Sequence, residues 1–155
     1  MKRLVAATVF AAAVCPTFAQ TNPAAVASPA LERAKALFER YVALEKAFDP
    51  SVADLYSDAA VITNTRTYPT GEVREITIPA PQYKQLIRAG MPLARQVNDT
   101  NRYSECAYAP AGDRVAITCK RFAERKQYTS PIRLVVGPGE GSTWVIHEEH
   151  SESIP

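Results

Sequence analysis

The chain has 155 residues, of which 46% are hydrophobic and 22% charged, with 6 Gly and 12 Pro. These proportions are typical of one globular domain and exclude a coiled coil, a collagen or a disordered chain. The formal net charge of +2 comes from Lys2 and Arg3. The chain has 18 Lys and Arg residues and 16 Asp and Glu residues, so without these two basic residues the charges balance. Because the rest of the chain has no net charge, we do not expect nucleic acid or an anionic membrane surface as a partner.

The first 19 residues have the layout of a secretory signal peptide. Two basic residues precede an uncharged apolar run over residues 4–14, and small residues stand at both ends of 17–19. The run is too short to cross a bilayer as a helix. We therefore expect cleavage after residue 19, a periplasmic or secreted product, and no membrane attachment after cleavage. A lipid-modified Cys15 is the alternative, but Val14 argues against it because a small residue is expected there.

The next residues predict a short lead and then helices. Residues 20–28 are rich in Ala, Pro and Ser and predict a flexible lead. Ser28-Pro29 is a helix-capping pair, and apolar residues at intervals of three and four then predict an amphipathic helix over 29–47. Asp49-Pro50 repeats the capping signal and opens a brief second helix.

The rest of the chain predicts mainly strands. Residues 60–66 and 72–78 are expected to pair across a turn, and a third helix follows from 82 to about 91, which Pro92 ends or kinks. The remaining strands are expected to be antiparallel, over 103–109, 114–127, 132–136 and 143–151. Helices first and a curled sheet afterwards describe one α+β domain over 29–153.

Cys106 and Cys119 are the only cysteines left after cleavage, and an even count in an exported chain favours a disulfide. If Gly112 and Asp113 form a two-residue hairpin loop, the numbers of facing residues sum to 225, and the two cysteines lie directly opposite. Theirs is a non-hydrogen-bonded pair, in which side chains approach most closely. A structural disulfide is preferred to a redox-active one because Cys-x-x-Cys spacing is absent.

Two stretches resemble the nuclear transport factor 2-like superfamily. Residues 55–62 (LYSDAAVI) are similar to its short helix leading into the first strand. Trp144-Val145-Ile146, followed by Glu148 and His150, is similar to its tryptophan-led last strand. The resemblance implies an α+β cone, in which a curved antiparallel sheet carries a long N-terminal helix and two shorter helices on its concave face. It also implies an apolar pocket between the layers and a possible homodimer through the sheet. It implies no particular reaction, because ketosteroid isomerases, scytalone dehydratases and polyketide cyclases share the shell.

The resemblance aligns Asn64 with the carboxylate base of the isomerase branch. An amide cannot take a substrate proton, so Asn64 is expected either to orient a ligand by hydrogen bonding or to be satisfied by neighbouring backbone. Tyr41 and Tyr83 lie on inward helical faces and are expected to form pocket walls. The hydroxyls of Tyr56 and Tyr128 are further candidates to reach the cavity.

On the last strand, strict alternation places Trp144, Ile146, Glu148 and His150 on the inner face, with Glu149 among the residues of the outer face. Desolvation at the mouth of an apolar cavity would raise the pKa of Glu148 and suit it to acid/base work beside His150. The plain alternative is an ion pair with a facing arginine such as Arg121. No metal is expected, because the two histidines are three residues apart on a strand and face opposite ways.

We therefore expect an exported, non-catalytic domain that needs no cofactor and binds a small apolar or amphipathic molecule or a protein partner. Its ligand-binding residues would be Asn64, Tyr41, Tyr83 and Trp144. The alternative is a cofactor-free isomerase, lyase or hydratase with Glu148 and His150 as catalytic residues. A structural component of the cell envelope is a third possibility, and the sequence leaves open whether the protein is an enzyme.

Overall fold

The structure is a computed structural model that describes residues 28–154. The expected signal peptide over residues 1–19, and the lead over 20–28 apart from Ser28, lie outside the described residues. Within 28–154, no helix is long and apolar enough to cross a membrane.

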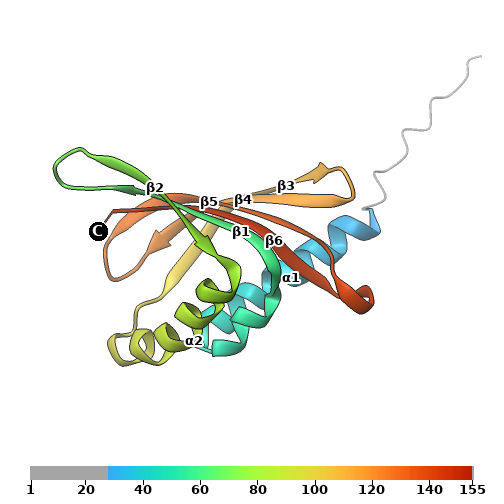
Figure 1. Cartoon of the computed structure of the whole chain (residues 1–155), viewed down its shortest axis with the longest axis horizontal. Helices are drawn as coiled ribbons and strands as arrows, with labels where there is room; N and C mark the ends of the chain where they lie inside the picture. Colours follow the sequence, from blue (N-terminus) through green and yellow to red (C-terminus); the bar gives the residue numbers. More distant parts are fainter. Residues whose placement is uncertain (1–27, 155) are drawn as a thin grey trace, which may run out of the picture.

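Helices and strands follow one another in an α+β order (Figure 1). The elements are α1 (Pro29–Lys46), the 3₁₀ helix η1 (Pro50–Leu55), β1 (Tyr56–Thr67), β2 (Val73–Pro79), α2 (Ala80–Val97), β3 (Asn101–Ala111), β4 (Arg114–Ala123), β5 (Tyr128–Pro138), the 3₁₀ turn η2 (Glu140–Ser142) and β6 (Trp144–Ser153). The strands form one curved sheet in the order β2-β1-β6-β5-β4-β3, and α1 and α2 cover its concave face. The expected fold class is confirmed.

The helix starts follow their capping residues. The Ser28 hydroxyl accepts a hydrogen bond of 3.2 Å from the Leu31 amide at the first turn of α1, and the Asp49 carboxylate accepts one of 2.8 Å from the Ser51 amide at η1. These bonds satisfy amides that the first helical turn leaves without partners.

Two expectations about the elements need correction. The third helix does not end near residue 91: α2 continues through Pro92 to Val97 and ends at Asn98, whose φ is 50°. Arg95, beyond the proline, anchors this added turn by donating a hydrogen bond of 2.8 Å to the Ala47 carbonyl. The sheet is also mixed, because β1 pairs with β6 in parallel, whereas the other four pairs are antiparallel.

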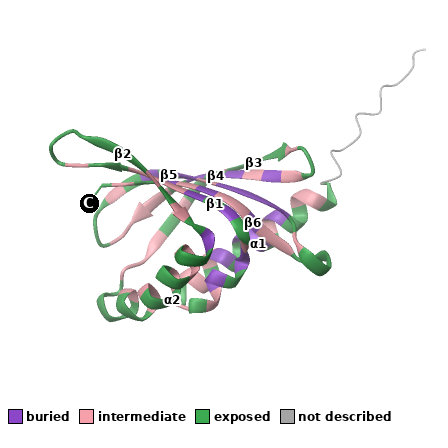
Figure 2. Cartoon of the chain, in the orientation of Figure 1, coloured by how far each residue is buried: buried purple, intermediate pink, exposed green. Residues whose placement is uncertain are grey.

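The core lies between the helices and the concave face. Figure 2 shows buried residues concentrated where the sheet passes over α1, while the outer surface of α2 is exposed. The largest fully buried apolar side chains, which come from η1 and the central strands, are Val52, Ile62, Ile117, Ile132, Leu134, Val136 and Ile146.

The hairpin of β3 and β4 carries the expected disulfide. Cys106 and Cys119 are bonded, with their Cα atoms 4.2 Å apart. The expected register holds from the loop as far as Ala107 and then shifts before Ser104, where Glu105 adopts a φ of 50°. This β-bulge puts one additional residue into β3 and changes which side chains beyond it face the helices.

Candidate functional site

The last strand does not alternate evenly between the two faces of the sheet. The register of β6 against β5 shifts at Val135, so that His147 and Glu148 together take the place opposite this one residue. An insertion of this kind is a β-bulge, which resets the alternation of the strand beyond it. Glu149 consequently occupies the concave-face position that uninterrupted alternation assigns to Glu148.

Glu149 is a buried carboxylate held by two tyrosines. The residue is 2% exposed. Tyr83 of α2 donates a hydrogen bond of 2.9 Å to its Oε1, and Tyr56 at the start of β1 donates one to its Oε2. Burial and the nearby charge of Glu149 raise the pKa of both tyrosines well above the usual value. Both hydroxyls therefore stay protonated at neutral pH and remain donors to the carboxylate.

A second carboxylate, Glu45, lies near the end of α1. Its oxygens accept hydrogen bonds of 2.6 Å from the Tyr103 hydroxyl and 2.8 Å from the Asn101 amide. Burial raises the pKa of Glu45 by more than these bonds lower it. Tyr103 reaches Glu45 because the bulge at Glu105 turns it toward the helices. Bulges in β3 and β6 thus supply a tyrosine and a carboxylate to the same concave face.

Arg121 of β4 compensates both carboxylates. Burial alone would lower its pKa, but nearby tyrosines and the charges of Glu149 and Glu45 raise it above its ordinary value. Its guanidinium also donates hydrogen bonds of 3.3 Å to the Ser130 hydroxyl and 2.8 Å to the Glu152 carbonyl. Arg121 is therefore a permanent positive charge fixed within the concave face.

A cavity of about 280 Å³ opens beside Glu149 and Arg121. Its apolar wall is Ile62, Ile76 and Ile78, and its polar wall is Asn64, Tyr83, Arg121, Glu149, Ser151 and Ser153, with the exposed Arg66 also lining it. We call this space the Glu149 cavity. It joins an apolar surface to several polar groups, which is the usual composition of a small-molecule site.

A larger cavity of about 760 Å³ lies between α1 and β3, with Phe38, Tyr103 and Tyr108 among its lining residues. The hydroxyl of Tyr103 is committed to Glu45, and the charged Arg102 and Glu124 in its wall form an ion pair with each other. The remaining charged residues of its lining, Glu39 and Lys46, are exposed. We prefer the Glu149 cavity as the site because its wall carries a buried carboxylate together with Tyr83 and Arg121.

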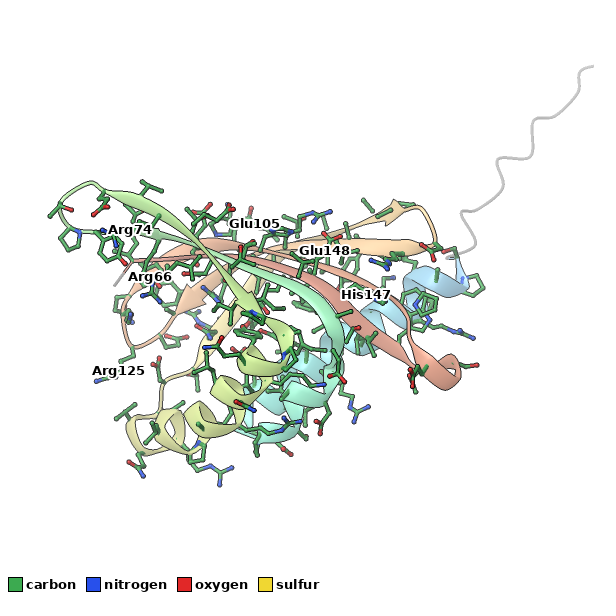
Figure 3. The ribbon with its side chains drawn as sticks, in the orientation of Figure 1. Arg66, Arg74, Glu105, Arg125, His147 and Glu148 are labelled. Carbon is green, nitrogen blue, oxygen red and sulfur yellow. A yellow bond between two sulfur atoms is a disulfide. The ribbon has the colours of Figure 1, made fainter. Side chains whose placement is uncertain are left out.

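The placement expected for Glu148 and His150 was wrong. Both lie on the convex side of the sheet, away from the helices, and Figure 3 shows Glu148 there. Glu148 pairs with Arg133 of β5 at 3.1 Å. Its slight burial raises its pKa, but hydrogen bonds from Arg133 and His150 lower the pKa by more. The net shift is therefore downward, opposite to the shift expected. The ion pair anticipated as the alternative does form, with Arg133 in place of Arg121.

Two of the four expected ligand-binding residues line the Glu149 cavity, namely Asn64 and Tyr83. The Asn64 side chain is already engaged, because its Nδ2 donates a hydrogen bond of 3.0 Å to the Ser151 hydroxyl and its Oδ1 accepts one of 2.8 Å from Ser153. The binding roles of Asn64 and Tyr83 stay predictions.

The other two expected residues lie elsewhere. Tyr41 is buried in an aromatic cluster, with its ring centroid 6.0 Å from that of Phe38 and 6.1 Å from that of Tyr103. Trp144 borders a separate hollow against α1, beside Arg33 and Arg40. The structure therefore does not bring the four together.

Glu149, Tyr103 and the role of Arg121 were not predicted from the sequence. The signal that could have found Glu149 is the adjacent acidic pair at 148 and 149, which supplies a carboxylate to the concave face in either phase of the strand. Within residues 28–154, no group of three or more His, Cys, Asp or Glu side chains is placed to hold a metal ion.

No protein-family model matches the chain, and a comparison with curated proteins found no match either. Solved structures do match in fold. A nuclear transport factor 2-like protein from Shewanella oneidensis has a TM-score of 0.57 at 12% identity, covering 79% of this chain and 98% of its own. A candidate ketosteroid isomerase from Shewanella frigidimarina has a TM-score of 0.53 at 16% identity, covering 77% of this chain and 94% of its own. A candidate dehydratase from Streptomyces avermitilis has a TM-score of 0.52 at 11% identity, covering 79% of this chain and 94% of its own. The chain therefore has the nuclear transport factor 2-like, cystatin-like fold.

Proposed function

We propose that this protein is an exported domain that binds a small amphipathic molecule in the Glu149 cavity. The observation that carries the proposal is a carboxylate, 2% exposed and held by two tyrosine hydroxyls, at the wall of a cavity that isoleucines of β1 and β2 also line. A buried charge is costly unless it is paired and hydrogen-bonded, so a carboxylate kept at a cavity wall is expected to serve the cavity's occupant.

The lining of the cavity defines the chemistry of its ligand. The isoleucines at 62, 76 and 78 would contact a hydrocarbon portion. Glu149 would accept a hydrogen bond from a hydroxyl or amino group, and Arg121 would donate to a carbonyl or carboxylate oxygen. A volume of about 280 Å³ lies at the small end of ligand pockets, which favours a compact molecule over a steroid-sized one.

Binding is preferred to catalysis because the tyrosine donors are already used. Tyr56 and Tyr83 both donate to Glu149, and their raised pKa values keep them protonated. Each carboxylate oxygen of Glu149 already accepts one of these hydrogen bonds, so fewer of its lone pairs are free to take a substrate proton. The arrangement thus holds a ligand more readily than it moves a proton.

An isomerase, lyase or hydratase remains the second candidate, with Glu149 in the role that the sequence assigned to Glu148. It is favoured by the enclosed carboxylate beside an apolar wall, and some solved structures of this fold are described as candidate isomerases or dehydratases. This candidate predicts turnover of enolisable ketones or hydroxy acids that Glu149→Gln abolishes and Glu148→Gln leaves unchanged.

Export is supported by the disulfide between Cys106 and Cys119, because structural disulfides persist in oxidising compartments. The intact mass of the protein recovered from its host tests this part of the proposal. We expect a chain that begins after residue 19 and contains the disulfide. A full-length chain with free thiols in the cytoplasm would contradict it.

Native mass spectrometry of protein isolated from its host tests ligand binding. We expect a retained small molecule, whose identity then allows affinity to be measured by calorimetry. Glu149→Gln and Arg121→Gln should each weaken that affinity at least tenfold, or about 1.4 kcal/mol. Glu148→Gln and Arg133→Gln are matched controls on the convex face and should not change it. Protein that carries no ligand, or equal losses in both pairs of variants, would refute the proposal.

A further inference from the structure

The convex face carries a second cluster of reactive side chains, on the side of the sheet opposite the Glu149 cavity. It consists of Thr63 from β1, Arg133 from β5, and Glu148 and His150 from β6. Neighbouring strands bring them together, because Thr63 faces His150 across the β1–β6 pair and Arg133 faces His150 across the β5–β6 pair. Figure 3 shows Glu148 along this face of the sheet.

The distances within the cluster form a chain from a hydroxyl to a carboxylate. Thr63 Oγ1 lies 2.6 Å from His150 Nδ1, and His150 Nε2 lies 3.4 Å from Glu148 Oε2. With its proton on Nε2, His150 donates to Glu148 and accepts the Thr63 hydroxyl proton at Nδ1. A hydroxyl, an imidazole and a carboxylate in this order are the components of nucleophilic catalysis.

We propose that Thr63, His150 and Glu148 form a site for acyl transfer from small esters. Thr63 Oγ1 attacks the ester carbonyl carbon and forms a C–O bond, while His150 Nδ1 takes the hydroxyl proton. The bond between the carbonyl carbon and the leaving oxygen then breaks, and the leaving oxygen receives that proton from His150. Water repeats the sequence on the acyl-threonine, which releases a carboxylic acid and restores Thr63 and neutral His150.

The surroundings supply the other requirements of the reaction. Thr63, His150 and Arg133 line one cavity of about 190 Å³ on the convex face. The Arg133 guanidinium pairs with Glu148 through Nη1, and the proposal assigns its remaining N–H groups to the oxyanion of the tetrahedral intermediate. The His150 side chain is 43% exposed, so an ester can approach from solvent. The small volume limits the acyl group to a short one such as acetyl.

The test uses p-nitrophenyl acetate with the complete disulfide-bonded chain. We expect a burst of p-nitrophenolate and an acetyl group on the peptide that contains Thr63, found by mass spectrometry. Thr63→Val, which keeps the side-chain shape, should abolish both, and Thr63→Ser should retain them. His150→Asn should slow acylation about 100-fold, the lower end of what a general base contributes. Glu148 acts as a positioning residue, so Glu148→Gln should lower kcat with KM unchanged, and Glu148→Asp should restore part of the loss.

The other of the chain's 2 histidines provides the control. His147 lies on the same strand with its Nε2 3.0 Å from the Pro138 carbonyl, so His147→Asn should leave the burst unchanged. Circular dichroism establishes that each variant is folded. If Thr63→Val does not fold, Thr63→Ser still tests the role of the hydroxyl. Acetyl groups on lysines alone, or equal losses in the two histidine variants, would overturn the proposal. The Glu149 cavity lies on the other face, so its ligand should bind equally well to Thr63→Val.

Discussion

Replacing Glu149 by alanine, with Glu148→Ala as its matched control, tests whether the bulge in β6 puts Glu149 on the concave face. In Glu149→Ala, the hydroxyls of Tyr56 and Tyr83 lose the acceptor to which both donate. A buried donor left without a partner costs about 1–3 kcal/mol, so two of them should cost about 3 kcal/mol after some relief from removing a buried charge. Glu148 is a third exposed and pairs with Arg133, and such an ion pair contributes about 0–1 kcal/mol.

The free energies of unfolding can be measured by urea titration, followed by the fluorescence of Trp144, the chain's 1 tryptophan. Thermal unfolding should show a fall of about 12 °C for Glu149→Ala and at most about 4 °C for Glu148→Ala, at about 4 °C for each kcal/mol in a domain of this size. Equal costs, or a larger cost for Glu148→Ala, would mean that β6 alternates without interruption. Glu149 would then not face the helices, and the cavity named after it could not be the binding site.

Three further predictions concern stability. Replacing Cys106 and Cys119 together by serine should lower the free energy of unfolding by about 3 kcal/mol, because the disulfide joins residues 13 apart in sequence, and urea titration of the oxidised wild type beside the variant checks this. Since the folded-state pKa of Glu45 is raised, the native state binds more protons than the unfolded state above the ordinary carboxyl range. The contribution of Glu45 to the free energy of unfolding should thus fall as pH rises through that raised pKa. Glu45→Gln should remove this part of the pH dependence when urea titrations of the two proteins are compared over a range of pH. Parallel curves of stability against pH would contradict the prediction. Pro92→Ala should stabilise α2 by about 1–2 kcal/mol in thermal unfolding because proline lacks an amide donor inside the helix, and a lower Tm in the variant would show that the proline is accommodated without cost.

The correct expectations are those that depend on local chemistry. The capping pair at Ser28 predicted the start of α1, and the two-residue loop at Gly112 predicted the partners near it and brought Cys106 and Cys119 together. Each depends on residues a few positions apart or on a hairpin register counted from a tight turn. Such signals remain readable without knowledge of the rest of the fold.

The errors share one physical origin. Period-two alternation tells which residues of a strand share a face only while the strand is uninterrupted, and one inserted residue exchanges the faces beyond it. The bulge at His147 places Glu149 on the concave face instead of Glu148, and the bulge at Glu105 turns Tyr103 toward Glu45. Neither bulge has a glycine or another local signature in the sequence.

The fold class, the long first helix, the hairpin register near its loop and the disulfide could all be predicted from the residues, because each follows from composition, periodicity or turn chemistry. The parallel pairing of β1 with β6, and the choice of Glu149 to face the helices while Glu148 faces Arg133, became visible only in the folded molecule. They depend on packing, because the register of a strand is set by the strands and helices that pack against it. Of two adjacent carboxylates, one therefore forms a surface ion pair and the other the buried wall of a cavity.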